Sequence, residues 1–133
     1  MAGSLTSLTA TEAHREITRG ALSAEEYVTA CLDRIEDLDG DVRAFVHIDR
    51  AHALKQARDL DAWRRNGRPT GPLHGLPVAV KDIVDTRDYP TECGSPLLAG
   101  RRPRQDATIV EKLRAAGAII IGKTVTTEFA YYH

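Results

Sequence analysis

The sequence predicts an α/β fold, and three observations support this prediction. The first half carries apolar residues at helical spacing, placed behind residues that commonly cap helices. Two short apolar runs, 78–84 and 118–121, have the length and composition of strands. A helical pattern that starts at Asp106 separates these runs, and a strand, helix, strand order is typical of a parallel, right-handed crossover.

Two helices are expected near the N-terminus. Thr9 or Thr11 is in position to cap a first short helix that Gly20 ends. Ser23-Ala24-Glu25-Glu26 has the form of a capping box, in which Ser23 and Glu26 satisfy each other's free backbone amides. The apolar residues that follow at helical spacing predict an amphipathic helix.

A strand and a third helix are expected next. Residues 42–48 are typical of a strand, and Asp49 can cap a long helix that stops at Asn66-Gly67. Residues 68–77 contain too many glycines and prolines for regular structure. They lead into the strand 78–84, which two charged residues interrupt.

The composition is that of a globular protein. Hydrophobic residues make up 42% and charged residues 28%, with a net charge of −1, so neither a disordered chain nor a nucleic-acid partner is indicated. The basic segment 101–104 has no interleaved aromatics and reads as a solvated loop. The apolar runs are far shorter than the roughly 20 residues that cross a membrane.

The two cysteines, Cys31 and Cys93, are far apart and lack metal-site spacing. The polar N-terminal segment shows no secretory leader, so two free thiols in the cytoplasm are expected. A disulfide between them remains an alternative. No metal and no cofactor is predicted.

Residues Gly117–Thr124 match the letter pattern of a phosphate-binding loop, G-x-x-x-x-G-K-[ST]. Such a loop must follow a strand and open a helix, so that its amides converge on the phosphate. Here Gly117 is expected to close a helix, and the branched residues that follow favour a strand. Nucleotide binding is therefore not predicted.

Lys81 is the first candidate for chemistry. In a strand, Lys81 shares one face with Ala79 and Ile83, a small apolar surface on which burial would favour the neutral, basic amine. The alternative is a surface lysine paired with a nearby aspartate. The candidates for that pairing are Asp82, Asp85 and Asp88. Because buried lysines are rare, the residues alone favour the surface interpretation.

The other polar residues give weaker signals. Ser95 could act as a nucleophile with a lysine as its base, but Gly-Ser-Pro is also ordinary turn sequence, and Cys93 is typical of a packed small residue. His74 is expected to fix a loop by hydrogen bonds rather than to act as a base. The residues His47, Asp49 and His52 lack metal-site spacing and are interpreted as a surface cluster.

Taken together, residues Gly71–Asp82 resemble the segment that carries the catalytic lysine in the amidase signature family. The resemblance continues through 91–95, 106–110, 113–118, 122–124 and 128–129. The N-terminal pattern from Leu22 to Val46 is also similar to that family's opening helices. The resemblance therefore covers nearly the whole chain.

This resemblance implies an enzyme that hydrolyses a carboxamide C–N bond of a small molecule through an acyl-enzyme intermediate. In the family, one serine attacks the carbonyl, a second serine in a cis peptide relays protons, and a lysine is the base. Lys81 aligns with that lysine, so the resemblance favours a desolvated, neutral Lys81 on its apolar strand face over the surface interpretation. Ser95 aligns with a non-nucleophilic serine and is expected to line the substrate pocket. The implied fold has helices covering a mixed central sheet.

The chain departs from the family in its serines. Its four serines are Ser4, Ser7, Ser23 and Ser95. None matches either catalytic serine, and Phe129, Tyr131 and Tyr132 crowd the C-terminus. Residues 1–133 are therefore expected to be the truncated N-terminal part of a single amidase domain, inactive alone, with a homo-oligomer or a complementing chain as its partner.

Two alternatives remain open from the sequence. One is the glutaminase-type subunit of a transfer-RNA-dependent amidotransferase, which shares the same lysine segment. The other is a non-catalytic product that serves as a binding or assembly module.

Overall fold

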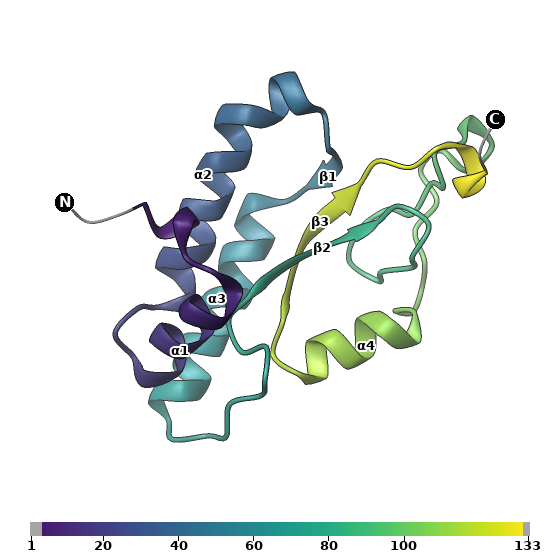
Figure 1. Ribbon diagram of the computed structural model, residues 1–133. Helices are drawn as coiled ribbons and strands as arrows, with labels where there is room; N and C mark the ends of the chain where they lie inside the picture. The colour runs from purple at the N-terminus through teal and green to yellow at the C-terminus, as the bar shows by residue number, and fades with distance from the viewer. Residues whose placement is uncertain (1–3, 132–133) are drawn as a thin grey trace.

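The computed structural model describes residues 4–131 and has an α/β architecture in which helices lie on both faces of a small sheet (Figure 1). The helices are α1 (Ala10–Arg19), α2 (Ala24–Val42), α3 (Arg50–Arg65) and α4 (Thr108–Ala115). The strands are β1 (Phe45–Ile48), β2 (Pro77–Lys81) and β3 (Ile119–Thr124). Single 3-10 turns lie at Leu5–Ser7, Pro96–Leu98 and Glu128–Ala130.

The sheet is mixed, with strand order β1-β3-β2. The central strand β3 runs antiparallel to β1 and parallel to β2. The parallel pairing on either side of α4 confirms the predicted strand, helix, strand unit. Within the described residues, β1 and β2 are the edge strands of the sheet.

Two apolar cores flank the sheet, because successive side chains of a strand point to opposite faces. Ile119 and Ile121 of β3 pack into a larger core with α1, α2 and α3, while Ile120 packs into a smaller core with Val110 of α4. Figure 1 shows α4 apart from the other three helices, beyond β2 and β3. The strand β3 is thus buried on both faces.

The local signals at the helix ends are confirmed. Thr9 and Ser23 both form capping boxes, and Gly20 ends α1 in the left-handed conformation with φ 80°. Asp49 caps α3 by accepting a hydrogen bond from the amide of His52 at 2.9 Å. These features depend on a few adjacent residues, which is why the sequence reveals them.

The predicted start of the first strand at Val42 is wrong, because α2 continues through Val42 and β1 begins at Phe45. The Asp39 carboxylate accepts hydrogen bonds from the amides of Ala44 at 2.7 Å and Phe45 at 3.3 Å. Arg43 takes a left-handed φ of 55° and ends the helix. This side-chain bridge across the helix end stabilises the last turn of α2.

Two further boundaries differ from the prediction. The strand β2 ends at Lys81 rather than at residue 84, because the chain turns and the Val84 amide donates to the Lys81 carbonyl at 2.9 Å. Asp106 does not cap α4: Ala107 holds the cap position, and the Asp106 side chain binds Arg114 Nε at 2.9 Å instead. Asp106 is used for a contact that the expected capping pattern does not reveal.

The phosphate-loop pattern does not form a phosphate loop, as predicted. Gly117 follows the end of α4, and the rest of the pattern lies in β3. The strand extends through Thr124, so the predicted end at residue 121 is wrong. No described residue of this pattern opens a helix, which is the geometry that phosphate binding requires.

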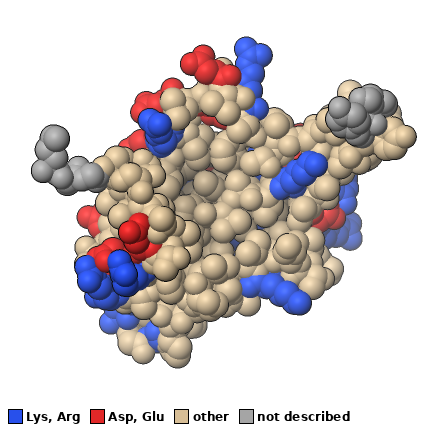
Figure 2. All heavy atoms as spheres, in the orientation of Figure 1, with Lys and Arg blue, Asp and Glu red and all other residues tan. Residues whose placement is uncertain are grey.

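The surface carries charges of both signs. Figure 2 shows lysine and arginine side chains interspersed with aspartate and glutamate around the rim of one face, with uncharged atoms across its centre. Phe129 and Tyr131 are exposed, whereas Tyr132 lies outside the described residues. Among residues 4–131, no helix has the length and apolar content needed to cross a membrane.

Candidate active site

Lys81 is the last residue of β2, and its side chain is exposed. Ala79 on the same strand face is half-buried, and Ile83 is exposed. The expectation that Lys81 lies buried on an apolar face is therefore wrong within residues 4–131. The apolar character of a strand face does not bury it unless another element covers it. Ala79 packs against the larger core, but no described element covers Lys81 further along the same face.

The alternative, a surface lysine paired with a nearby aspartate, is right about the exposed position at the strand end and wrong about the pairing. Asp82 pairs with Lys123 at 3.2 Å, and Asp85 binds Arg101 through two contacts of 2.7 and 2.9 Å. The third candidate, Asp88, binds His52 at 2.8 Å and Arg114 at 2.7 Å. Within the described part of the chain, the Lys81 ammonium group has neither a hydrogen bond nor an ion pair.

A second lysine, Lys123, is fully buried in β3 and was not among the predicted site residues. Its Nζ donates to Thr91 Oγ1 at 2.6 Å and to the Pro90 carbonyl at 3.1 Å, and it pairs with Asp82 Oδ1 at 3.2 Å. Burial lowers the pKa of Lys123, while the Asp82 carboxylate opposes that shift. The sequence did contain a signal for this burial, because Lys123 directly follows a run of residues that are expected to be buried in a strand.

Ser95 is buried, with 4% of its surface exposed, and lies in the segment that follows the β2 turn. Its Oγ donates to Glu128 Oε1 at 2.6 Å and accepts from the Leu97 amide at 3.3 Å. It lines a pocket of about 280 Å³ together with Asp82 and Glu92. Its place in a pocket wall is compatible with a role in substrate binding, which stays a prediction.

The backbone beside Ser95 is strained. Cys93 and Phe129 both have positive φ, 54° and 49°, which is costly for residues other than glycine. The two residues are hydrogen-bonded to each other, since the Phe129 amide donates to the Cys93 carbonyl at 2.8 Å. Cys93 and Cys31 are both free thiols, as expected.

The predicted cluster of His47, Asp49 and His52 does not form. His47 Nε2 lies 2.8 Å from Glu92 Oε2, while His52 binds Asp88 on a different part of the surface. The ligand atoms of His47, Asp82 and Glu92 lie within 4.8 Å of one another, an arrangement that could hold a metal ion. The Lys123 ammonium already binds Asp82, so a cation there would compete with a built-in positive charge.

His74 is buried in the loop before β2, with 1% of its surface exposed. Its amide donates to the Gly71 carbonyl at 3.1 Å, whereas its ring Nε2 has no hydrogen bond among the described residues, so a loop-fixing role of the side chain stays a prediction. Burial lowers the pKa of His74.

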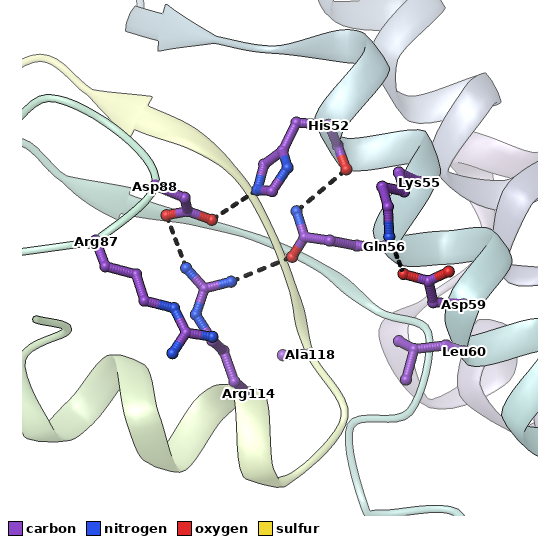
Figure 3. Close-up of a pocket in the computed structure, with 9 residues that line it drawn as sticks. All are labelled: His52, Lys55, Gln56, Asp59, Leu60, Arg87, Asp88, Arg114 and Ala118. Carbon is purple, nitrogen blue, oxygen red and sulfur yellow. Dashed lines mark hydrogen bonds and ion pairs between the residues drawn. The ribbon is translucent and has the colours of Figure 1, made fainter.

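A larger pocket of about 490 Å³ lies between α3 and α4 (Figure 3). Figure 3 shows the Asp88 carboxylate between His52 and Arg114, and Arg114 also donates to Gln56 Oε1 at 3.2 Å. At the rim, Lys55 pairs with Asp59. Lys81 does not line this pocket. The network joins α3, α4 and the loop at residue 88.

From this network we predict that the stability of the fold decreases at acid pH. Burial alone would raise the pKa of Asp88, but hydrogen bonds from His52 and Arg114 outweigh it and hold the pKa below the usual range. The unfolded state then binds this proton more readily than the folded state, so the stabilisation is complete above the ordinary aspartate pKa of about 3.9 and is lost as the pH falls through the lower, folded-state pKa. Thermal melts between pH 5 and pH 2 should show a steeper loss of stability for the natural protein than for Asp88→Asn.

The matched control for this prediction is Asp59→Asn, because Asp59 is exposed and pairs along its own helix with Lys55. Its melts should keep the pH dependence of the natural protein. If the melting temperature falls with pH equally steeply for the natural protein and for Asp88→Asn, the prediction is contradicted.

Comparison with known proteins defines the family. The amidase family model matches residues 26–133, and the chain belongs to this family. The resemblance drawn from the sequence motifs is confirmed.

The chain is similar to the A-type subunit of glutamyl-tRNA(Gln) amidotransferase from Salinispora arenicola, with 52% identity over 95% of this chain and 26% of the relative. The corresponding protein of Thermobifida fusca is 47% identical, over 95% of this chain and 25% of the relative. The chain thus spans about a quarter of the length of these relatives.

Solved structures agree with the fold. The peptide amidase of Stenotrophomonas maltophilia superposes with a TM-score of 0.84 and 38% identity, covering 90% of this chain and 25% of that chain. A structure from a vestigial protein complex, described in connection with the origins of an s-triazine catabolic enzyme, gives 0.89 with 34% identity, covering 93% of this chain and 27% of that chain. The mixed α/β fold predicted from the sequence is confirmed.

Proposed function

We propose that this chain supplies the lysine base of an enzyme that hydrolyses a carboxamide bond, and that Lys81 is this base. One observation carries the proposal: the Lys81 ammonium is unpaired among the described residues, although three aspartates follow it within seven positions. A lysine that accepts a proton must first be neutral, and a paired carboxylate would hold it in the charged form. Each of the three aspartates is instead bound by another cation.

In the proposed reaction, the neutral amine of Lys81 accepts a proton from the hydroxyl of a relay serine. That serine takes the proton of the nucleophilic serine, whose oxygen forms a bond to the carbonyl carbon of the amide. The C–N bond then breaks, and the proton passes back through the relay to the departing nitrogen. Water hydrolyses the resulting acyl ester by the same proton route.

The chain's four serines do not match either catalytic serine of the family, so we propose that both are supplied from outside residues 1–133. They would come from a longer polypeptide or from a complementing chain. The edge strands β1 and β2 and the exposed apolar residues Leu97, Ile109 and Val125 support a covering partner of either kind. A cytoplasmic location is proposed from the two free thiols.

The second candidate function is the glutaminase-type subunit of a transfer-RNA-dependent amidotransferase. The 52% identity to a glutamyl-tRNA(Gln) amidotransferase protein favours it, whereas 38% identity to a peptide amidase favours simple hydrolysis. In this candidate the ammonia would pass to a partner protein instead of being released.

The first experiment is to purify the protein from its source, determine its intact mass, and measure ammonia release from glutamine and from simple carboxamides. A mass well above the 14.6 kDa of this chain would identify a longer polypeptide, and a mass of 14.6 kDa would direct the search to a complementing chain. The natural assembly should release or transfer ammonia, and the isolated 133-residue chain should not. Absence of both activities from the natural assembly would overturn the proposal in favour of a non-catalytic binding or assembly module.

A further inference from the structure

Lys123 is the largest fully buried side chain among the described residues, and it is a charged one. Its three contacts lie on two segments: Asp82 directly after β2, and Pro90 and Thr91 in the loop that follows. The ammonium group donates hydrogen bonds to Thr91 and Pro90, and Asp82 Oδ1 lies 3.2 Å away as its ion-pair partner. The side chain is therefore held by directional contacts rather than by packing alone.

Asp82 is bound on both of its sides. Its side chain is 3% exposed, with Oδ1 facing Lys123 and Oδ2 accepting from the Glu92 amide at 3.3 Å. Its own amide donates to the Thr124 carbonyl at 2.9 Å, and its carbonyl accepts from the Cys93 amide at 2.9 Å. Asp82 thus fixes the end of β2 to β3 and to the segment that leads to Ser95.

Lys81 directly precedes Asp82, and the two side chains take opposite sides of the chain. Burial alternates here, since Val80 and Asp82 are buried whereas Lys81 and Ile83 are exposed. The register places Val80 opposite Lys123 and Lys81 opposite Thr124. Drawing Asp82 inward therefore determines the direction in which Lys81 leaves the sheet.

A buried ion pair is weak evidence for added stability, because well-packed apolar residues of similar volume often stabilise a fold as well or better. Apolar residues, however, would not fix the orientation of a side chain. The Asp82 carboxylate is oriented because it contacts the Lys123 ammonium and the Glu92 amide at the same time. The location of this pair beside the proposed base thus points to a role in geometry.

We infer that Lys123 is a positioning residue for Lys81, acting through Asp82 and the segment 90–93. The inference rests on the proposed function, because Lys81 must be the base for its position to affect the reaction. Lys123 itself is buried and makes no contact with substrate in this role.

The test compares Lys123→Met in two backgrounds of the natural, amide-hydrolysing protein, with an activated anilide as substrate so that slow turnover remains measurable. With Lys81 present, Lys123→Met should lower kcat by about 100-fold, the loss typical of a misplacement of about 1 Å, with KM changed by less than about threefold. In the Lys81→Ala background the same substitution should change kcat by less than about threefold, because there is no base left to misplace. Lys112→Met, at an exposed lysine of α4, is the matched control and should leave kcat unchanged in both backgrounds.

Thr91→Val provides a second variant if Lys123→Met does not fold, since it removes the shortest hydrogen bond of Lys123 and keeps both charges. It should show the same dependence on Lys81 with a smaller loss, about tenfold in kcat. Equal losses in the two backgrounds would overturn the inference and leave Lys123 a purely structural residue. Full activity of Lys81→Ala alone would instead overturn the proposed function, so the two failures are distinguishable.

Discussion

Replacement of Lys81 by alanine is expected to lower kcat for amide hydrolysis by about 10³-fold, within the range of a general base, while KM changes little. The reason is that the amine acts on a proton in the transition state and is not required to bind the amide in the ground state. Because Lys81 is exposed and unpaired among residues 4–131, its removal breaks no described side-chain bond, so folding should be preserved. The measurement is steady-state release of ammonia or amine by the natural protein, with thermal melts of both forms.

Two further variants sharpen this test. Lys81→Arg keeps the positive charge but cannot lose its proton near neutral pH, so it should be as inactive as the alanine variant. Lys112→Ala removes an exposed lysine of α4 and should retain full activity. Activity in Lys81→Arg would show that the reaction needs a positive charge at this position and not a base, which would contradict the proposed role.

The features that could be predicted from the sequence are those that adjacent residues determine. The capping boxes at Thr9 and Ser23 and the stop at Gly20 each need only a few consecutive side chains. The burial of β3 likewise follows from a run of branched residues. Lys81 was singled out by its strand position and by the family motif around it, and its role as the base stays a prediction.

What could not be predicted depends on residues distant in the chain. The exposure of Lys81 depends on which elements cover its strand face, and the burial of Lys123 depends on the loop at Pro90 and Thr91 folding over β3. Asp61 is another case: it is buried in α3 and accepts from the amides of Ala24 and Glu25 at the start of α2. A polar residue that binds so distant a segment of the chain gives no periodic or motif signal.

The glycines of the phosphate-loop pattern have a packing role instead. A Cβ at Gly122 would lie 2.4 Å from the His47 carbonyl oxygen and 3.1 Å from Ile48 Cγ1. The letters Gly-Lys-Thr therefore reflect a close approach of β1 to β3, together with the buried ammonium of Lys123. The sheet needs these residue types for close strand packing and for a buried ion pair, and not for binding phosphate.

Gly122→Ala is accordingly expected to lower the free energy of unfolding by about 3 kcal/mol, the upper part of the range for overpacking a core. The clash is with a main-chain oxygen, which cannot rotate away as a side chain can, so the strand β1 must separate from β3. Urea unfolding of the natural protein and the variant, followed by circular dichroism, measures this difference.

Gly40→Ala is the matched control, because it adds the same methyl group within α2 with nothing within 4 Å of the new Cβ. It should raise the free energy of unfolding by about 0.5 to 1 kcal/mol, since alanine loses less backbone freedom than glycine in a helix. The same change from glycine to alanine is thus expected to lower the free energy of unfolding at position 122 and to raise it at position 40. A Gly122→Ala variant as stable as the natural protein would mean that β1 does not pair closely with β3, and His47 would then lose the strand that places it against Glu92.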